Sequence, residues 1–186
     1  MMPVIRISDA AFTNLKHIAT WLEADTPSQT IDRLVQNEME RLGLERDGES
    51  EAENGAGEDI LIFEKAPGLS FTRILSAAID NGPPIKTNWA GLLLEVVRKV
   101  HAKGITKERL IRELQVPAKV SKYEQHGFKY YPSLGISIQG QSASDVWKEV
   151  DRLAKKHGIP VDLEFQWRDN EKAQHPNRTA RIRAGL

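Results

Sequence analysis

The stretch SASDVWKEVDRLAKKHGIPVDLEFQW, residues 142–167 of the 186-residue chain, combines a complete helix signal with a strand signal. Ser142 and Asp145 match a capping box at the start of a helix, and Gly158 is the residue type that commonly ends one. Between these ends, apolar residues recur at the spacing of one helix face: Val146, Trp147, Val150, Leu153 and Ala154. From Val161 onward apolar and polar residues alternate, which predicts a strand with one buried face.

Strands are also predicted on the N-terminal side of this helix, in FKYY (128–131) and LGISIQG (134–140). Because strand, helix and strand follow one another with short connections, we expect a β-α-β unit. Residues 85–104 and the segment that begins at Thr106 have capped helical patterns, whereas residues 69–82 fit either a helix or a strand. The C-terminal domain is therefore predicted to be a small mixed α/β (α+β) domain.

The segment ERDGESEAENGAGED, residues 45–59, is acidic and has no large apolar side chain, so it predicts a disordered linker. It separates an N-terminal module, residues 1–44, from a basic C-terminal domain, residues 60–186. Residues 1–59 contain 5 Lys or Arg and 13 Asp or Glu, whereas residues 60–186 contain 21 and 13. This division favours a polyanion partner for the C-terminal domain, although ordinary scatter of surface charge gives the same totals.

The N-terminal module begins with VIRIS, residues 4–8, in which apolar and polar residues alternate as in a strand. Two amphipathic helices are predicted after it. Ser8 or Asp9 can cap the first helix, and Thr26 with Gln29 forms a capping box for the second. So short a module cannot bury these apolar faces alone, and a single strand has no partner. We therefore expect two chains to pair their strands antiparallel and to pack their helices together.

The order strand, helix, helix resembles the ribbon-helix-helix family, and in particular the SeqA-type N-terminal oligomerisation domains of replication-initiation modulators. VIRISDAAFTNLKHIA (4–19) and SQTIDRLVQNEME (28–40) carry this resemblance, which extends over about residues 3–43. The resemblance implies a homodimer or a higher homo-oligomer that forms through residues 1–44.

The resemblance also implies a double-stranded DNA partner. Arg6 on the outer face of the strand is the base reader that such a module would use. Ser28 lies at the start of the second predicted helix, where a phosphate can bind. In SeqA-type proteins the oligomerising domain is tethered to a reader of DNA adenine methylation, so recognition of modified DNA is expected by analogy. Residues 60–186 do not resemble that reader.

Basic residues gather at two places in the C-terminal domain, and both are candidate DNA contacts. One set lies on the outward side of the helix in residues 142–158: Lys148, Arg152, Lys155 and Lys156. The other set lies in the C-terminal tail: Arg168, Lys172, Arg178, Arg181 and Arg183. The alternative is a solvated helix face followed by a frayed tail that has no role in binding.

The stretch YEQHGFKYYPSLG, residues 123–135, interleaves aromatic and cationic side chains. Aromatic faces beside cations can stack on an exposed or flipped base, so Tyr130 and Tyr131 are candidate DNA contacts. The alternative, which the pattern favours, is a strand with one aromatic face in the core and the other in water.

Asp162, Glu164 and Gln166 share one face of the strand that begins at Val161. Two carboxylates near basic residues could bind Mg²⁺ in a divergent nuclease, but Gln166 stands where such sites usually have a lysine. An ordinary polar strand face is the preferred interpretation. No catalytic residue, metal site or cofactor is therefore predicted. The absence of cysteine excludes disulfides and the commonest zinc-finger types.

These patterns predict a dimeric prokaryotic DNA-binding regulator of transcription, replication, or restriction and defence. A cytoplasmic, nucleoid-associated location is expected, because no signal segment or membrane-spanning apolar run is present in the sequence. Two alternatives stay open. One is a metal-dependent DNA nuclease, and the other is an antitoxin-like module that binds a protein partner.

Overall fold

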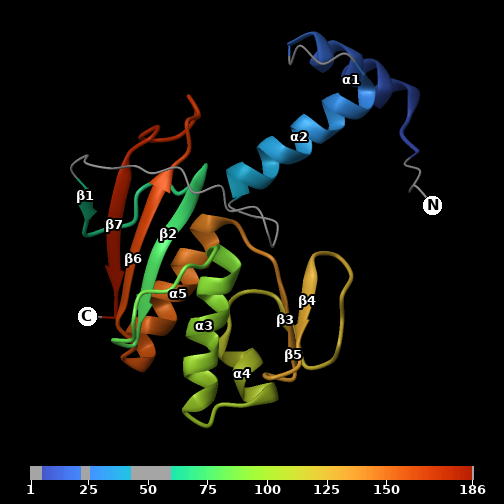
Figure 1. The fold of residues 1–186 in the computed structure, drawn as a ribbon. Helices are drawn as coiled ribbons and strands as arrows, with labels where there is room; N and C mark the ends of the chain where they lie inside the picture. Colours follow the sequence, from blue (N-terminus) through green and yellow to red (C-terminus); the bar gives the residue numbers. More distant parts are fainter. Residues whose placement is uncertain (1–5, 22–25, 43–59, 186) are drawn as a thin grey trace. The chain divides into compact units, whose positions relative to one another are not determined.

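The computed structural model of the protein describes residues 6–21, 26–42 and 60–185. These residues form five helices and two sheets (Figure 1), which confirms the predicted mixed α/β class. The chain divides into two compact units, Met1–Met39 and Glu40–Leu186. The linker predicted over residues 45–59 lies outside the described residues.

Two helices begin in the N-terminal unit, α1 (Asp9–Trp21) and α2 (Pro27–Leu42), at the places that the sequence predicts. Thr26 and Gln29 form the predicted capping box, in which each backbone N–H donates to the other residue's side-chain oxygen at 3.2 Å. Ser8 caps α1, because its Oγ accepts from a backbone N–H three residues farther on, at 3.2 Å. Local capping signals therefore set where both helices begin.

The strand predicted over residues 4–8 lies only in part within the described residues. Residues 6–8 have no regular secondary structure, and residues 1–5 lie outside the described residues. The described part of the unit leaves large apolar side chains exposed: Ile7, Phe12, Ile18 and Val35. The pairing of this segment between two chains stays a prediction.

The C-terminal domain is built on a four-stranded sheet with the strand order β1-β7-β6-β2 (Figure 1). Its strands are β1 (Leu61–Phe63), β2 (Thr72–Ile79), β6 (Val161–Trp167) and β7 (Thr179–Ala184). β1 pairs parallel with β7, and the other neighbours pair antiparallel. Helices α3 (Trp89–Ala102) and α5 (Ala143–His157) pack side by side against one face of the sheet. The alternation along β6 places its apolar side chains in the core on this face.

A smaller antiparallel sheet has the strand order β3-β5-β4, and helix α4 (Lys107–Glu113) precedes it in the chain. Its strands are β3 (Ala118–Lys119), β4 (Phe128–Tyr131) and β5 (Ile136–Gln139). Ile136 and Ile138 are buried in the same hydrophobic core as the helices and the larger sheet. The two sheets therefore share one core.

The predicted pairing of strands around α5 is wrong. Residues 134–140 and 161–167 do contain strands, but β5 belongs to the smaller sheet and β6 to the larger one. α5 therefore does not connect two strands of one sheet, as a β-α-β unit requires. Periodicity identifies a strand but not the neighbour with which it pairs. The ambiguous segment 69–82 contains the strand β2 and no helix.

The C-terminal segment is part of the larger sheet and is not a frayed tail. β7 is an inner strand, and Ala180, Ile182 and Ala184 are buried on its core side. A strand signal that depends on alanine is weak, because alanine is not a favoured strand residue. Arg181 and Arg183 alternate with these residues and lie on the other face of the sheet.

Candidate nucleic-acid interface

The basic residues predicted on α5 lie on its outward side, but their surroundings divide them into two pairs. Arg152 and Lys156 contact the end of α4, whereas Lys148 and Lys155 line a cavity beside β1. Helical spacing explains this division. Members of each pair are four or seven residues apart, so each pair follows its own edge of the helix.

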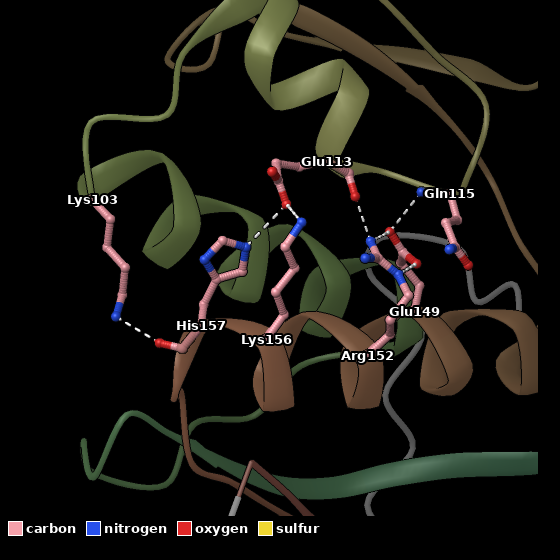
Figure 2. Close-up of polar contacts among 7 residues, drawn as sticks. All are labelled: Lys103, Glu113, Gln115, Glu149, Arg152, Lys156 and His157. Carbon is pink, nitrogen blue, oxygen red and sulfur yellow. Dashed lines mark hydrogen bonds and ion pairs between the residues drawn. The ribbon is translucent and has the colours of Figure 1, made fainter.

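Arg152 is held by a buried carboxylate (Figure 2). Its Nε and Nη2 atoms each donate to Glu149 at 2.8 Å, and Nη2 also donates to the backbone carbonyl of Glu113. Only 3% of Glu149 is exposed, and its Oε1 also accepts from the N–H of Gln115 at 2.8 Å. The hydrogen bonds with Glu149 raise the pKa of Arg152 above its ordinary value. These contacts join α5 to the end of α4, so they give Arg152 a structural role.

Glu113, the last residue of α4, is contacted by two residues at the end of α5 (Figure 2). Lys156 Nζ lies 2.7 Å from Glu113 Oε2, and His157 Nε2 lies 3.2 Å from the same oxygen. The hydrogen bond from Lys156 holds the pKa of Glu113 below its ordinary value, against a smaller opposing effect of desolvation. Lys103, just past α3, donates to the carbonyl of His157 at 2.7 Å. The ends of three helices are thus tied together at this point.

The other edge of α5 borders a cavity of about 280 Å³, which we call the β1–α5 cavity. The cavity lies among α5, β7 and the segment that follows β1. At this place β1 has ended at Phe63, whereas its neighbour β7 continues to Ala184. Ser144, Trp147 and Ile182 contribute to its wall. Its charged lining residues are Lys65, Lys148, Lys155, Arg183, Glu64 and Asp151. Cations therefore outnumber carboxylates around this cavity.

Two of these cations have carboxylate partners, and two do not. Lys155 Nζ lies 2.7 Å from Asp151, and Arg183 Nε donates to a carboxylate of β6 at 2.9 Å. Within the described ranges, no carboxylate pairs with Lys65 or Lys148. The cavity therefore has an excess of positive charge and two ammonium groups that are available to an anion.

The acidic face of β6 is neutralised by arginines of β7. Asp162 accepts from Arg181 Nη2 at 2.7 Å and from Arg183 Nε at 2.9 Å. Partial burial opposes ionisation, but these hydrogen bonds, first that of Arg181, hold the pKa of Asp162 below its ordinary value. Glu164 lies opposite Arg181 in the strand register, and Gln166 accepts from an arginine of β2 at 2.8 Å. No group of three or more His, Cys, Asp or Glu among the described residues is placed to hold a metal ion.

The remaining basic candidates do not line the cavity. Arg168 and Arg178 are half-buried, one at each end of the loop between β6 and β7. Arg6 and Ser28 are exposed and belong to the N-terminal unit. Of the predicted DNA contacts, only Lys148, Lys155 and Arg183 line the cavity in the described structure. Lys65, which was not among the predicted contacts, also lines it. No pattern in the sequence indicates Lys65, because it lies in a loop whose position depends on the pairing of β1 with β7.

The aromatic stretch is divided between the core and the surface. Tyr131 packs against the hydrophobic core, and Tyr130 is half-buried on β4. Tyr123, in contrast, is contacted by Lys119, whose Nζ lies 3.2 Å from the centroid of the tyrosine ring. Lys119 belongs to β3, and sequence spacing could not place it there, because the contact depends on the pairing of β3 with β5.

Comparisons with models of protein families, with curated proteins and with solved structures found no match to this chain. The functional assignment therefore rests on the chemistry of its own side chains. None of the helices in the described ranges combines the length and the apolarity needed to cross a bilayer. The unpaired lysines of the β1–α5 cavity are the described feature best suited to an anionic ligand.

Proposed function

We propose that the protein is a homodimeric regulator that binds double-stranded DNA, with the β1–α5 cavity as a phosphate contact. The observation that carries the proposal is that Lys65 and Lys148 border one cavity and have no carboxylate partner in the described part of the chain. A lysine ammonium is a compact charge that neutralises phosphate, and such contacts supply most of the non-specific affinity for DNA. Lys155 and Arg183 extend the same positive surface.

The N-terminal unit supplies the dimer in this proposal. Ile7, Phe12 and Ile18 are exposed, and a second copy would cover them while its first strand pairs with the segment around Arg6. That arrangement is the one expected of a ribbon-helix-helix module. A dimer would present two cavities to one DNA, which raises the apparent affinity without any new contact. By analogy with SeqA-type proteins, the protein would regulate replication, transcription or defence at the nucleoid, with methylated DNA as one target.

The metal-dependent nuclease is less well supported than DNA binding without cleavage. Asp162 already accepts hydrogen bonds from two arginines, so both of its oxygens are occupied.

The proposal is tested by fluorescence anisotropy with the full-length protein and duplex DNA, unmodified and adenine-methylated. We expect binding that weakens steeply between about 50 and 200 mM salt. The double variant Lys65→Gln with Lys148→Gln is expected to bind about tenfold more weakly at fixed salt, because two phosphate contacts are lost. A difference between the two duplexes would identify methylation as part of the recognised signal.

The matched control is Lys86→Gln with Arg112→Gln, which removes the same charge from exposed positions that do not line the cavity. This control is expected to bind within about twofold of the wild type. Equal losses in both double variants would assign the affinity to net charge and not to the cavity. No binding at low salt, together with a stoichiometric protein that co-purifies, would replace the proposal with the antitoxin-like alternative.

A further inference from the structure

A second group of side chains outside the core combines aromatic rings with a cation. We call Lys119, Tyr123, His126 and Phe128 the aromatic cluster. None of the four belongs to the hydrophobic core. Lys119 Nζ lies 3.2 Å from the centroid of the Tyr123 ring and 4.9 Å from that of Phe128. The rings of Tyr123 and Phe128 meet edge to face at 5.2 Å.

The backbone around His126 is held in a tight turn. His126 and Gly127 have φ values of 54° and 76°, and the N–H of Phe128 donates to the carbonyl of Gln125 at 3.1 Å. Two consecutive left-handed residues with this hydrogen bond form a type I′ turn, a conformation that histidine tolerates better than most residues. Gln139 Nε2 also donates to the carbonyl of His126 at 2.9 Å. The exposed imidazole therefore projects from a fixed backbone.

The other side of the loop is anchored to a buried serine. Ser137 of β5 has no exposed surface, and its Oγ accepts from the N–H of Tyr123 at 2.9 Å. The same hydroxyl donates to the carbonyl of Ser121 at 2.8 Å. The tyrosine is thus positioned by the smaller sheet, not by the solvent-exposed loop alone.

The side chains of the cluster are also oriented toward one another. Tyr123 Oη and His126 Nδ1 lie 2.6 Å apart in a hydrogen bond, and the two ring planes differ by only 18°. This bond occupies Nδ1 and leaves Nε2 and a face of the exposed imidazole ring open to a ligand. The imidazole ring and the Lys119 ammonium group both contact Tyr123, and together they suit a ligand that has both a planar base and a phosphate.

We infer that the aromatic cluster binds an unpaired base of a DNA target, which stacks on His126 while Lys119 contacts its phosphate. This inference rests on the proposed DNA-binding function and adds a class of target to it, namely DNA with an extrahelical or single-stranded base. A fully paired duplex hides its base faces, so it can use the β1–α5 cavity but not the aromatic cluster. The two sites therefore make separable contributions to binding.

The test uses the full-length protein and two duplexes of equal length. One contains 2-aminopurine as a single extrahelical base, and the other contains it in a base pair. We expect the extrahelical duplex to bind about tenfold more tightly and its 2-aminopurine fluorescence to fall when the base stacks. The variant His126→Asn removes the ring but suits the left-handed turn, so it should fold normally and lose both the preference and the quenching.

Tyr123→Phe keeps the ring and removes the hydrogen bond that orients the imidazole, so it should reduce the preference partly. Lys86→Gln, an exposed lysine that makes no contact with the cluster, is the control and should keep the preference. Equal affinity of the wild type for both duplexes, or a full preference in His126→Asn, would overturn the inference and leave the proposed function intact. No affinity for either duplex would overturn both.

Discussion

The two edges of α5 both carry basic residues, but these residues have different contacts. Along one edge, Arg152 and Lys156 are paired with a buried and a half-buried carboxylate and attach α4 to α5. Along the other edge, Lys155 is paired with Asp151, but Lys148 has no carboxylate partner within the described residues and faces a cavity. A basic residue on a helix surface is therefore informative about binding only when its partners are known.

The largest difference between the edges is expected in stability. Glu149→Ala removes the buried partner of Arg152, so it should lower the free energy of unfolding by about 3 kcal/mol. Asp151→Ala removes the partner of Lys155, which is 65% exposed, and should cost less than about 1 kcal/mol. Denaturant unfolding measures both variants. Similar losses for the two would show that the edges do not differ in this way.

The next largest difference is expected in DNA binding. Lys148→Gln should weaken binding about fivefold without changing the unfolding midpoint, because this lysine has no carboxylate partner among the described residues. Lys156→Gln makes the same chemical change on the other edge, and it should leave binding within about twofold while it slightly lowers stability. Anisotropy and thermal unfolding of both proteins measure this contrast. A loss of affinity in Lys156→Gln as large as that in Lys148→Gln would extend the interface across the whole outward side.

A smaller effect is expected from the sheet beside the cavity. Asp162→Asn removes the negative charge that holds Arg181 and Arg183, and Arg183 lines the cavity. We expect DNA affinity to rise by about twofold while stability falls. The nuclease alternative predicts a different result, namely cleavage of DNA in Mg²⁺ by the wild type and its loss in this variant. An incubation with Mg²⁺ and Mn²⁺, analysed on a gel, separates the two.

The smallest effect concerns the pH dependence of the structural edge. Because Lys156 holds the pKa of Glu113 below its unfolded value, the pairing adds stability above the unfolded carboxyl pKa. That stability is lost as the pH falls through the lower folded pKa. Glu113→Gln should therefore be less stable than the wild type at neutral pH, and the difference should shrink in acid. Urea unfolding at a series of acidic pH values measures it, and a difference that is constant with pH would contradict the assignment.

The sequence predicted those features that local signals determine. Ser142 caps α5, with the Asp145 N–H donating to Ser142 Oγ at 3.2 Å, and Gly158 ends the helix in the left-handed conformation. The other half of the predicted capping box differs, because the Asp145 carboxylate accepts from the Ser142 hydroxyl at 2.7 Å. The alternation in residues 161–167 is a strand with a buried apolar face. These signals depend on neighbours within a few residues, so no knowledge of the tertiary fold was needed.

The features that the sequence missed depend on contacts between distant segments. The neutralisation of Asp162 follows from the register that places it opposite Arg183 in β7. The position of Lys65 follows from the parallel pairing of β1 with β7, which joins segments more than 100 residues apart. Helical spacing makes Arg152 a candidate DNA contact, but its pairing with the buried Glu149 and its bond to the end of α4 depend on the packing of α4 on α5. Charge patterns in a sequence indicate which side chains are basic but not which are already paired.

The most direct test of the central claim is the salt dependence of duplex binding by the wild type and by the Lys65→Gln, Lys148→Gln double variant. Each phosphate contact contributes about 0.9 to the slope of log K against log salt concentration. If the two lysines of the β1–α5 cavity contact phosphates, the slope should become shallower by nearly two for each cavity that engages the DNA. A slope that is unchanged in the double variant, with the wild type binding normally, would contradict the claim that this cavity is the DNA contact.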